Sequence, residues 1–290
     1  MGNVLDKTEL VDRRGAAPVS PLVLLKPGVG KPLFIVPGLA GIVIELAKLG
    51  QGIDSPKPVY VIRAKGFDGT EEPLDTVPDM VAYSLAHLRA MQPNGPYYLA
   101  GYSFGGIIAM EMARCLNAAG ETVALLAFLD TFAHPQTFPK AAQRIMRLRS
   151  VIAPFRTKPP SEACALALAS LTAMLSGGTD DWVRSRFAWL APYVPEEGAD
   201  PALRVYAAGL TAVSNYWPVR YPGRVQFFYT RSRNFGASPR RVWGRLLGGL
   251  TLHAVAGDHH SMLREHAPYL AAALSTALRH AHSRASSCGR

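Results

Sequence analysis

The sequence feature that most restricts the fold of this chain is the stretch from Gly101 to Gly106, with the letters GYSFGG. An apolar run from Pro96 to Ala100 precedes it and predicts a buried strand, and Ile107 to Leu116 predicts a helix. A serine with a glycine two residues away on each side, at a strand-to-helix junction, is the pattern of a nucleophile elbow, whose turn is too tight for side chains at the glycines. Ser103 is therefore the candidate nucleophile.

Strand and helix patterns alternate through the first 131 residues. Nearly all-apolar strands such as Val123–Asp130 are typical of a parallel sheet that is covered on both faces. The alternation predicts a doubly wound α/β sheet. The predicted strands are Leu33–Val36, Val59–Ile62, Pro96–Ala100 and Val123–Asp130, and the predicted helices are Ile42–Leu49, Thr76–Met91 and Ile107–Leu116.

The alternation stops after residue 131, and the sheet pattern resumes only after residue 218. Between them lie four helical patterns, which we interpret as a helical lid inserted over the strand ends, where such sheets keep their ligands. These helices are predicted at 141–151, 163–175, 181–190 and 202–213. The domain prediction is an N-terminal arm over 1–30, an α/β core over 31–131 and 219–282, the lid over 132–218 and a disordered tail over 283–290. Late strands at 225–230 and 250–256 and a helix at 262–280 complete the core.

A serine nucleophile needs a base and an acid that orients the base. Of the carboxylates that follow the elbow, only Asp130 stands at the end of a core strand, so we predict that Asp130 is the acid. No acid follows the strand at 225–230, and Asp258 adjoins the candidate histidines too closely to hold their rings. Of the eight histidines, His259 and His260 lie in a loop directly after the last strand, where a base is needed.

The block from Gln92 to Asp130 closely resembles the thioesterase domains of nonribosomal peptide and polyketide synthases, which have the α/β-hydrolase fold. The similarity extends, more weakly across the lid, over residues 18 to 280 and includes Gly257-Asp258-His259. In that family the base is the histidine of Gly-x-His, which selects His259 over His260. The acid follows the strand after the elbow, as Asp130 does.

The resemblance implies that Ser103 attacks a thioester on the phosphopantetheine arm of a carrier protein, with His259 as the base and Asp130 as its partner. The resulting oxyanion would be bound by the backbone N–H groups of Leu39 and Phe104. Water, or a nucleophile within the acyl chain, would then release the product. The chain departs from the family in one respect, because Ala40 lies between Gly38 and Gly41, where the family often has two adjacent glycines.

Charge and composition restrict the partners. The formal net charge is +10, and residues 201–290 hold twelve arginines against Asp258 and Glu265. The chain has no nucleic-acid-binding signature, so this basic third is either an ordinary solvated surface or a docking surface for an acidic carrier protein. With no leader and no apolar run of membrane-spanning length, we expect a cytoplasmic protein. Three scattered cysteines indicate neither disulfides nor a metal site, and we expect no cofactor of the chain's own.

Two further functions fit the same residues. The enzyme alternative is an editing thioesterase that clears misprimed carriers, or an esterase of small esters. The second alternative is a hydrolase fold that binds ligands or partners without catalysis, which the ordered presence of Ser103, Asp130 and His259 makes less favoured. The sequence alone does not decide between hydrolysis and ring closure, because both use the same three side chains.

Overall fold

A computed structural model describes residues 20–131, 159–161, 164, 168, 200–231 and 239–288. In this part of the chain seven strands form one sheet in the order β1-β3-β2-β4-β5-β6-β7. Strand β1 is antiparallel to β3, and the other neighbouring strands are parallel. The strands are β1 (Leu22–Lys26), β2 (Leu33–Val36), β3 (Val59–Ile62), β4 (Tyr97–Tyr102), β5 (Val123–Leu129), β6 (Tyr221–Thr230) and β7 (Leu247–Val255). The prediction of a mostly parallel α/β sheet is confirmed.

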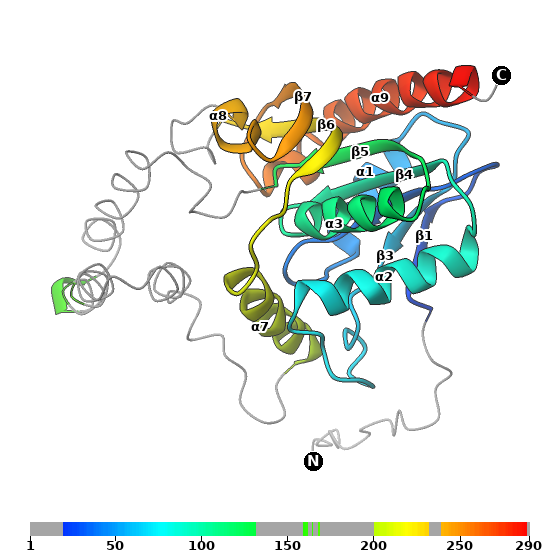
Figure 1. Cartoon of the computed structure of the whole chain (residues 1–290). Helices are drawn as coiled ribbons and strands as arrows, with labels where there is room; N and C mark the ends of the chain where they lie inside the picture. Colours follow the sequence, from blue (N-terminus) through cyan, green and yellow to red (C-terminus); the bar gives the residue numbers. More distant parts are fainter. Residues whose placement is uncertain are drawn as a thin grey trace, which may run out of the picture.

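Helices cover both faces of the sheet, with α2, α3 and α8 on one face and α1 and α9 on the other (Figure 1). Each face has its own apolar core, which explains why the central strands are almost entirely apolar. The helices are α1 (Ala47–Gly52), α2 (Val77–Met91), α3 (Gly105–Ala118), α7 (Pro201–Ser214), α8 (Pro239–Trp243) and α9 (Ala267–Cys288), and two short 3₁₀ turns are η1 (Ile44–Leu46) and η5 (Ser261–Leu263).

Local sequence signals fix where two of these helices begin. Thr76 caps α2, its hydroxyl accepting a hydrogen bond from the backbone N–H of Asp79 at 3.2 Å, and Pro78 lies in the first turn. Asp200 caps α7 in the same way by accepting from the N–H of Ala202 at 2.8 Å. None of the described helices is both long and apolar enough to cross a bilayer.

Two predictions about the ends of the chain are wrong. Residues 22–26, assigned to an arm outside the core, form the edge strand β1, whose backbone pairs with β3. The tail was expected to be disordered from residue 283, but α9 continues to Cys288. The open edge of β3 accepts Leu22–Lys26 as a neighbouring strand, whereas α9 continues past the residues that pack on the sheet.

The lid prediction is testable only at its end. The helix predicted at 202–213 is α7, while the patterns at 141–151 and 181–190, and nearly all of 163–175, lie outside the described residues. Helix α7 packs against the loops that follow β2 and β3. A Cβ built on Gly209 would lie 3.1 Å from the Leu39 carbonyl oxygen, and Arg204 pairs with Glu72 at 3.1 Å. The bounds of the lid, 132–218, stay a prediction.

Trp243, the largest fully buried side chain among the described residues, packs on the face of the sheet that α8 covers. Its ring centroid lies 5.1 Å from that of Phe128 and 6.4 Å from that of Phe227. We predict that Trp243→Ala lowers the free energy of unfolding by about 3 to 5 kcal/mol, because a large buried aromatic side chain is replaced by a cavity. Urea unfolding measures this change.

The matched control is Tyr269→Ala, because Tyr269 is 74% exposed on α9. It should change the free energy of unfolding by no more than about 0.5 kcal/mol. Equal losses in the two variants would contradict this description of the core.

Candidate active site

The predicted nucleophile lies in a strained turn between β4 and α3. Ser103 has a φ of 54°, in the left-handed region that residues other than glycine rarely adopt. Its N–H donates to the carbonyl oxygen of Leu129 at 2.9 Å, and its own carbonyl accepts from the N–H of Gly106 at 3.2 Å. Such a conformation persists only where its surroundings hold it, and here the neighbouring strand and the first turn of α3 do so.

The glycines of the motif are required by close backbone contacts. A Cβ on Gly101 would lie 2.2 Å from the carbonyl oxygen of Gly105, and one on Gly105 would lie 2.3 Å from those of Val36 and Pro37. Gly106 is equally restricted, because its Cβ would overlap the hydroxyl of Thr131. The prediction that the turn excludes side chains at Gly101 and Gly105 is confirmed.

The sheet brings the predicted acid close to the elbow. In the parallel register of β4 and β5, Tyr102 pairs with Leu129, so Ser103 and Asp130 each follow one member of that pair. The N–H of Asp130 donates to the carbonyl oxygen of Phe228 on β6 at 2.7 Å. Asp130 also has a positive φ, of 49°, at the end of its strand. Parallel strands thus place both residues at one edge of the sheet.

The Asp130 carboxylate is buried and bound on both oxygens. Oδ1 accepts hydrogen bonds from the N–H of Thr230 at 2.7 Å and from its hydroxyl at 3.0 Å. Oδ2 lies 2.8 Å from Nδ1 of His259 and 3.1 Å from the Thr230 hydroxyl. Asp130 is only 2% exposed, and a buried carboxylate is tolerated when it is paired in this way. The structure therefore joins the predicted acid to the predicted base.

Tyr102, the residue before the predicted nucleophile, holds the His259 loop against the elbow. Its hydroxyl donates to the carbonyl oxygen of His259 at 2.7 Å. The two rings also stack, with centroids 4.7 Å apart and planes 16° apart. Because Nδ1 faces the carboxylate, it carries the ring's proton in neutral His259, and Nε2 is left as the basic nitrogen.

The neighbours of His259 do not share its environment. His260 is exposed, whereas His259 is buried. Asp258 is exposed too, and its Oδ1 accepts from the backbone N–H groups of His260 and Ser261 at 3.0 and 2.8 Å. These hydrogen bonds, chiefly from Ser261, lower the pKa of Asp258. Asp258 thus shapes the loop around η5.

The loop after β2 lies against the elbow. It is closed by a hydrogen bond from the N–H of Gly41 to the carbonyl oxygen of Gly38 at 2.9 Å, and Gly41 has a φ of 65°. A Cβ on Gly38 would lie 3.4 Å from Cβ of Ser103. Within the described residues, the N–H groups of Leu39 and Phe104 donate to no other group. Two unpaired donors beside the serine are what an oxyanion site requires.

Sequence reasoning missed two residues that build this site. Thr230 binds Asp130 from β6, which is adjacent to β5 in space but far from it in sequence. Tyr102 stands at a variable position of the elbow motif, so the motif gives no signal for it. The sequence signal for Thr230 was its place at the end of a late strand. Among the described residues, no group of three histidine, cysteine or acidic side chains could hold a metal ion.

The sequence of the chain is similar to a family of thioesterase domains and to parts of larger synthetases. The family model described as "Thioesterase domain" matches residues 31–278. The chain is 38% identical over 136 residues to malpinin synthetase of Mortierella alpina, a match of 46% of this chain and 2% of that protein. It is also 38% identical over 120 residues to the nonribosomal peptide synthetase apvA of Aspergillus terreus, covering 41% of this chain and 13% of that one. The chain therefore spans a small part of the length of these relatives.

Solved structures share the fold. The NocB thioesterase domain, in covalent complex with a fluorophosphonate nocardicin G analogue, superimposes with a TM-score of 0.61 at 22% identity. The match covers 89% of this chain and 99% of that one. The prediction of an α/β-hydrolase fold of the thioesterase type is confirmed.

Removing the Thr230 hydroxyl tests how the carboxylate is held. Thr230→Val keeps the shape of the side chain but deletes a donor to both oxygens of Asp130. We predict a loss of about 1 to 3 kcal/mol in the free energy of unfolding, because a buried charged acceptor loses its hydrogen bond. Thr211→Val on the exposed face of α7 is the control, and should be nearly neutral. Equal effects in the urea unfolding of the two variants would contradict the assignment.

Proposed function

The chain belongs to the thioesterase domain family, and on this premise we propose that it releases acyl or peptidyl chains from a carrier protein through an acyl-serine intermediate. The observation that carries the proposal is the buried hydrogen bond of 2.8 Å between Asp130 and His259, beside the Ser103 turn. The two synthetases reported above, of which this chain matches a small part, support a substrate that is delivered as a carrier-bound thioester.

In the first half-reaction, the Ser103 hydroxyl oxygen attacks the thioester carbonyl carbon while Nε2 of His259 accepts the hydroxyl proton. Asp130 stabilises the imidazolium through the Nδ1 hydrogen bond. The oxyanion accepts hydrogen bonds from the N–H groups of Leu39 and Phe104, and each such donor contributes about 3 kcal/mol to the transition state. The carbon–sulfur bond then breaks, and the phosphopantetheine thiolate takes the proton from His259.

In the second half-reaction, a water molecule or a nucleophile of the acyl chain attacks the acyl-serine. His259 removes the proton of that nucleophile and returns it to Ser103 as the ester bond breaks. The products are a free acid or a ring, together with the restored serine hydroxyl. This chemistry needs no metal or cofactor of the chain's own, and phosphopantetheine enters as part of the substrate.

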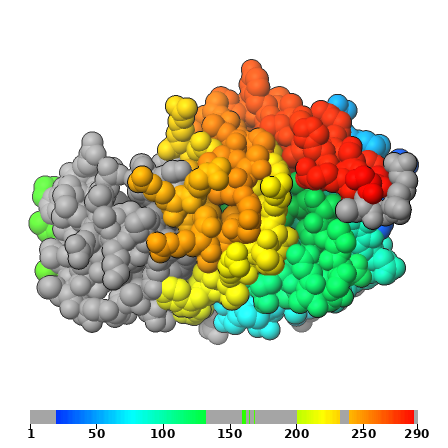
Figure 2. Space-filling view, turned by 45° about the horizontal axis from the view of Figure 1, so that its top comes forward, coloured from blue at the N-terminus to red at the C-terminus, as the bar shows by residue number. Residues whose placement is uncertain are grey.

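Docking of the carrier at the carboxyl edge of the sheet follows from the position of the site. The exposed arginines on β6 and α8 are Arg224, Arg240 and Arg241, and these two elements lie beside β7 in the yellow to orange part of Figure 2. Arg224 pairs with Gly249 near the amino end of β6, about 20 Å along the strand from Thr230. Arg231 and Arg264, both exposed, instead follow Thr230 and η5 directly. We assign the carrier contact to Arg231 and Arg264.

Substitution of the acid tests the catalytic proposal. Asp130→Asn should lower kcat by about 10³- to 10⁴-fold on a carrier-bound acyl thioester, because the amide no longer stabilises the His259 imidazolium. Ser103→Ala should lower it by about 10⁴-fold or more.

The control for Asp130→Asn is Asp258→Asn, which changes the exposed carboxylate beside the base and keeps an oxygen acceptor for its loop. It should stay within a few-fold of the wild-type rate. A Ser103→Ala protein that keeps its turnover would falsify the proposal, and so would an Asp258→Asn variant as inactive as Asp130→Asn. Faster turnover of simple esters than of carrier-bound thioesters would instead support a small-ester esterase.

Charge reversal tests the docking assignment. Arg231→Glu and Arg264→Glu should each raise KM for the carrier-bound thioester about 3- to 10-fold, with the difference shrinking at high salt. Neither should change KM for the same acyl group on N-acetylcysteamine, which has no carrier. Arg241→Glu, on α8, is the matched control. If only Arg241→Glu raised KM, the carrier would dock on the surface around α8, and the assignment to Arg231 and Arg264 would be wrong.

A further inference from the structure

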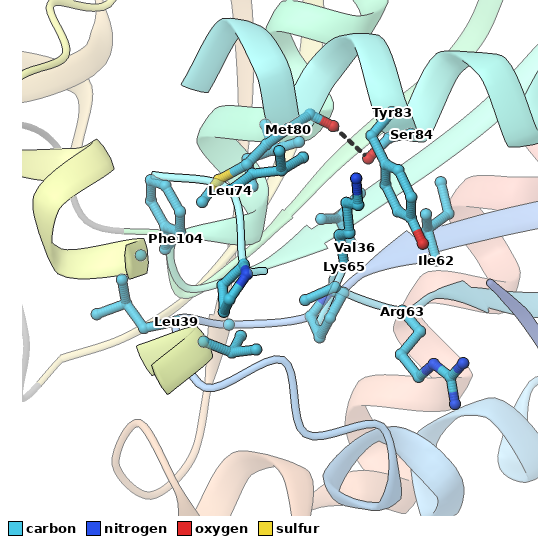
Figure 3. A pocket seen from close by; sticks show the side chains of 17 residues that line it. Val36, Leu39, Ile62, Arg63, Lys65, Leu74, Met80, Tyr83, Ser84 and Phe104 are labelled. Atoms are coloured by element: carbon cyan, nitrogen blue, oxygen red, sulfur yellow. Dashed lines mark hydrogen bonds between the residues drawn. The ribbon is translucent and has the colours of Figure 1, made fainter. Parts of the chain in front are cut away.

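A cavity that is partly open to solvent lies between α2, α7 and the loops that follow β2 and β3 (Figure 3). It adjoins the predicted reaction centre. Leu39 and Phe104, whose N–H groups face no partner in the described chain, both line it. So does Gly38, whose own built Cβ would lie 3.4 Å from Cβ of Ser103. A carbonyl group held at Ser103 therefore has this cavity next to it.

The walls of the cavity are mainly apolar. Six of the side chains that line it are Ile62, Leu74, Met80, Phe104, Ile108 and Val205. Figure 3 shows Met80 reaching from α2 towards Phe104, while Tyr83 and Ile62 lie at the opposite end. The surface is thus suited to burying hydrocarbon, which contributes about 25 cal/mol for each Å² removed from water.

The two charged side chains that line it, Arg63 and Lys65, already have partners. Arg63 pairs with Asp68 at 3.3 Å, and Lys65 pairs with Glu71 at 3.2 Å. The hydroxyl of Ser84 donates to the carbonyl oxygen of Met80 at 2.7 Å. An anionic ligand would therefore have to compete with carboxylates already present. These pairings favour an uncharged occupant.

Helix α7 closes the cavity on the side of the loop after β2. Val205 and Gly209 on this helix both line the space. A Cβ on Gly41 would lie 3.2 Å from the Val205 side chain, and one on Gly209 would lie 3.1 Å from the Leu39 side chain. Arg204, in the first turn of α7, also pairs with the exposed Glu72 in the loop after β3. Helix α7 therefore packs on the same loop that carries the Leu39 N–H.

We propose that this cavity is an acyl pocket, which receives an uncharged aliphatic or aromatic part of the acyl group close to the thioester carbonyl. The inference rests on the proposed function and deepens it by naming a substrate class. Met80 determines the size of the pocket at the end nearest Phe104. A chain with a bulky apolar group there should be turned over faster than one with a carboxylate, because only the former gains from burial.

The test uses N-acetylcysteamine thioesters of acetic, butanoic, hexanoic, phenylacetic and succinic acids. The wild-type chain should show a higher kcat/KM for butanoyl than for acetyl, and at least about 10-fold lower kcat/KM for succinyl than for butanoyl. Met80→Trp should lower the ratio of phenylacetyl to acetyl kcat/KM about 10-fold or more, and Met80→Ala should raise the ratio for the larger acyl groups. Opposite shifts from one position cannot arise from misfolding alone.

Met91→Ala is the matched control, because Met91 lies on the same helix, is 40% exposed and does not line the cavity. It should keep every ratio within about twofold of wild type. If both Met80 variants retain the wild-type ratios while thioesters are turned over in a Ser103-dependent way, the acyl pocket is wrong and the proposed function stands. A higher kcat/KM for succinyl than for butanoyl would also overturn the acyl pocket. A wild-type chain that turns over no thioester overturns the proposed function and the pocket together.

Discussion

Burial of the Asp130 carboxylate is the constraint on which the rest of the site depends. An ionised carboxylate out of water destabilises a protein unless its oxygens are paired and hydrogen-bonded. Here the strand end of β6 supplies Thr230, and the loop after β7 supplies His259. The need to satisfy the carboxylate fixes the imidazole ring in place. Tyr102 adds a second restraint, since it stacks on the ring and binds the loop's backbone.

The parallel sheet makes these contacts possible between residues that are far apart in sequence. Because β4, β5, β6 and β7 run in one direction, the residues that follow them meet at one edge of the sheet. The glycines of the elbow allow α3 and the loop after β2 to approach this edge at backbone distance. The same approach brings the Leu39 and Phe104 N–H groups beside Ser103 and leaves the cavity under α7 next to them.

How much of this could be predicted from sequence depends on how local each feature is. The elbow was predictable because strand, turn and helix are contiguous, and Asp130 because it ends the next apolar strand. His259 needed the family resemblance, since two adjacent histidines occupy the same loop. Thr230 and Tyr102 were not found because their roles depend on strand order and on the path of a loop. Strand β1 was missed for a related reason: its strand structure comes from pairing with β3, and its own pattern is weak.

In the proposed mechanism Ser103 carries the acyl group, and mass spectrometry of the acylated protein can locate that group. The full chain is mixed with a carrier protein loaded with a butanoyl group, quenched in acid within the first turnovers and digested for peptide mapping. We expect a mass gain of one butanoyl group in place of one hydrogen, on the peptide that contains Ser103. An acyl group found instead on another residue, such as Cys115, during productive turnover would contradict it.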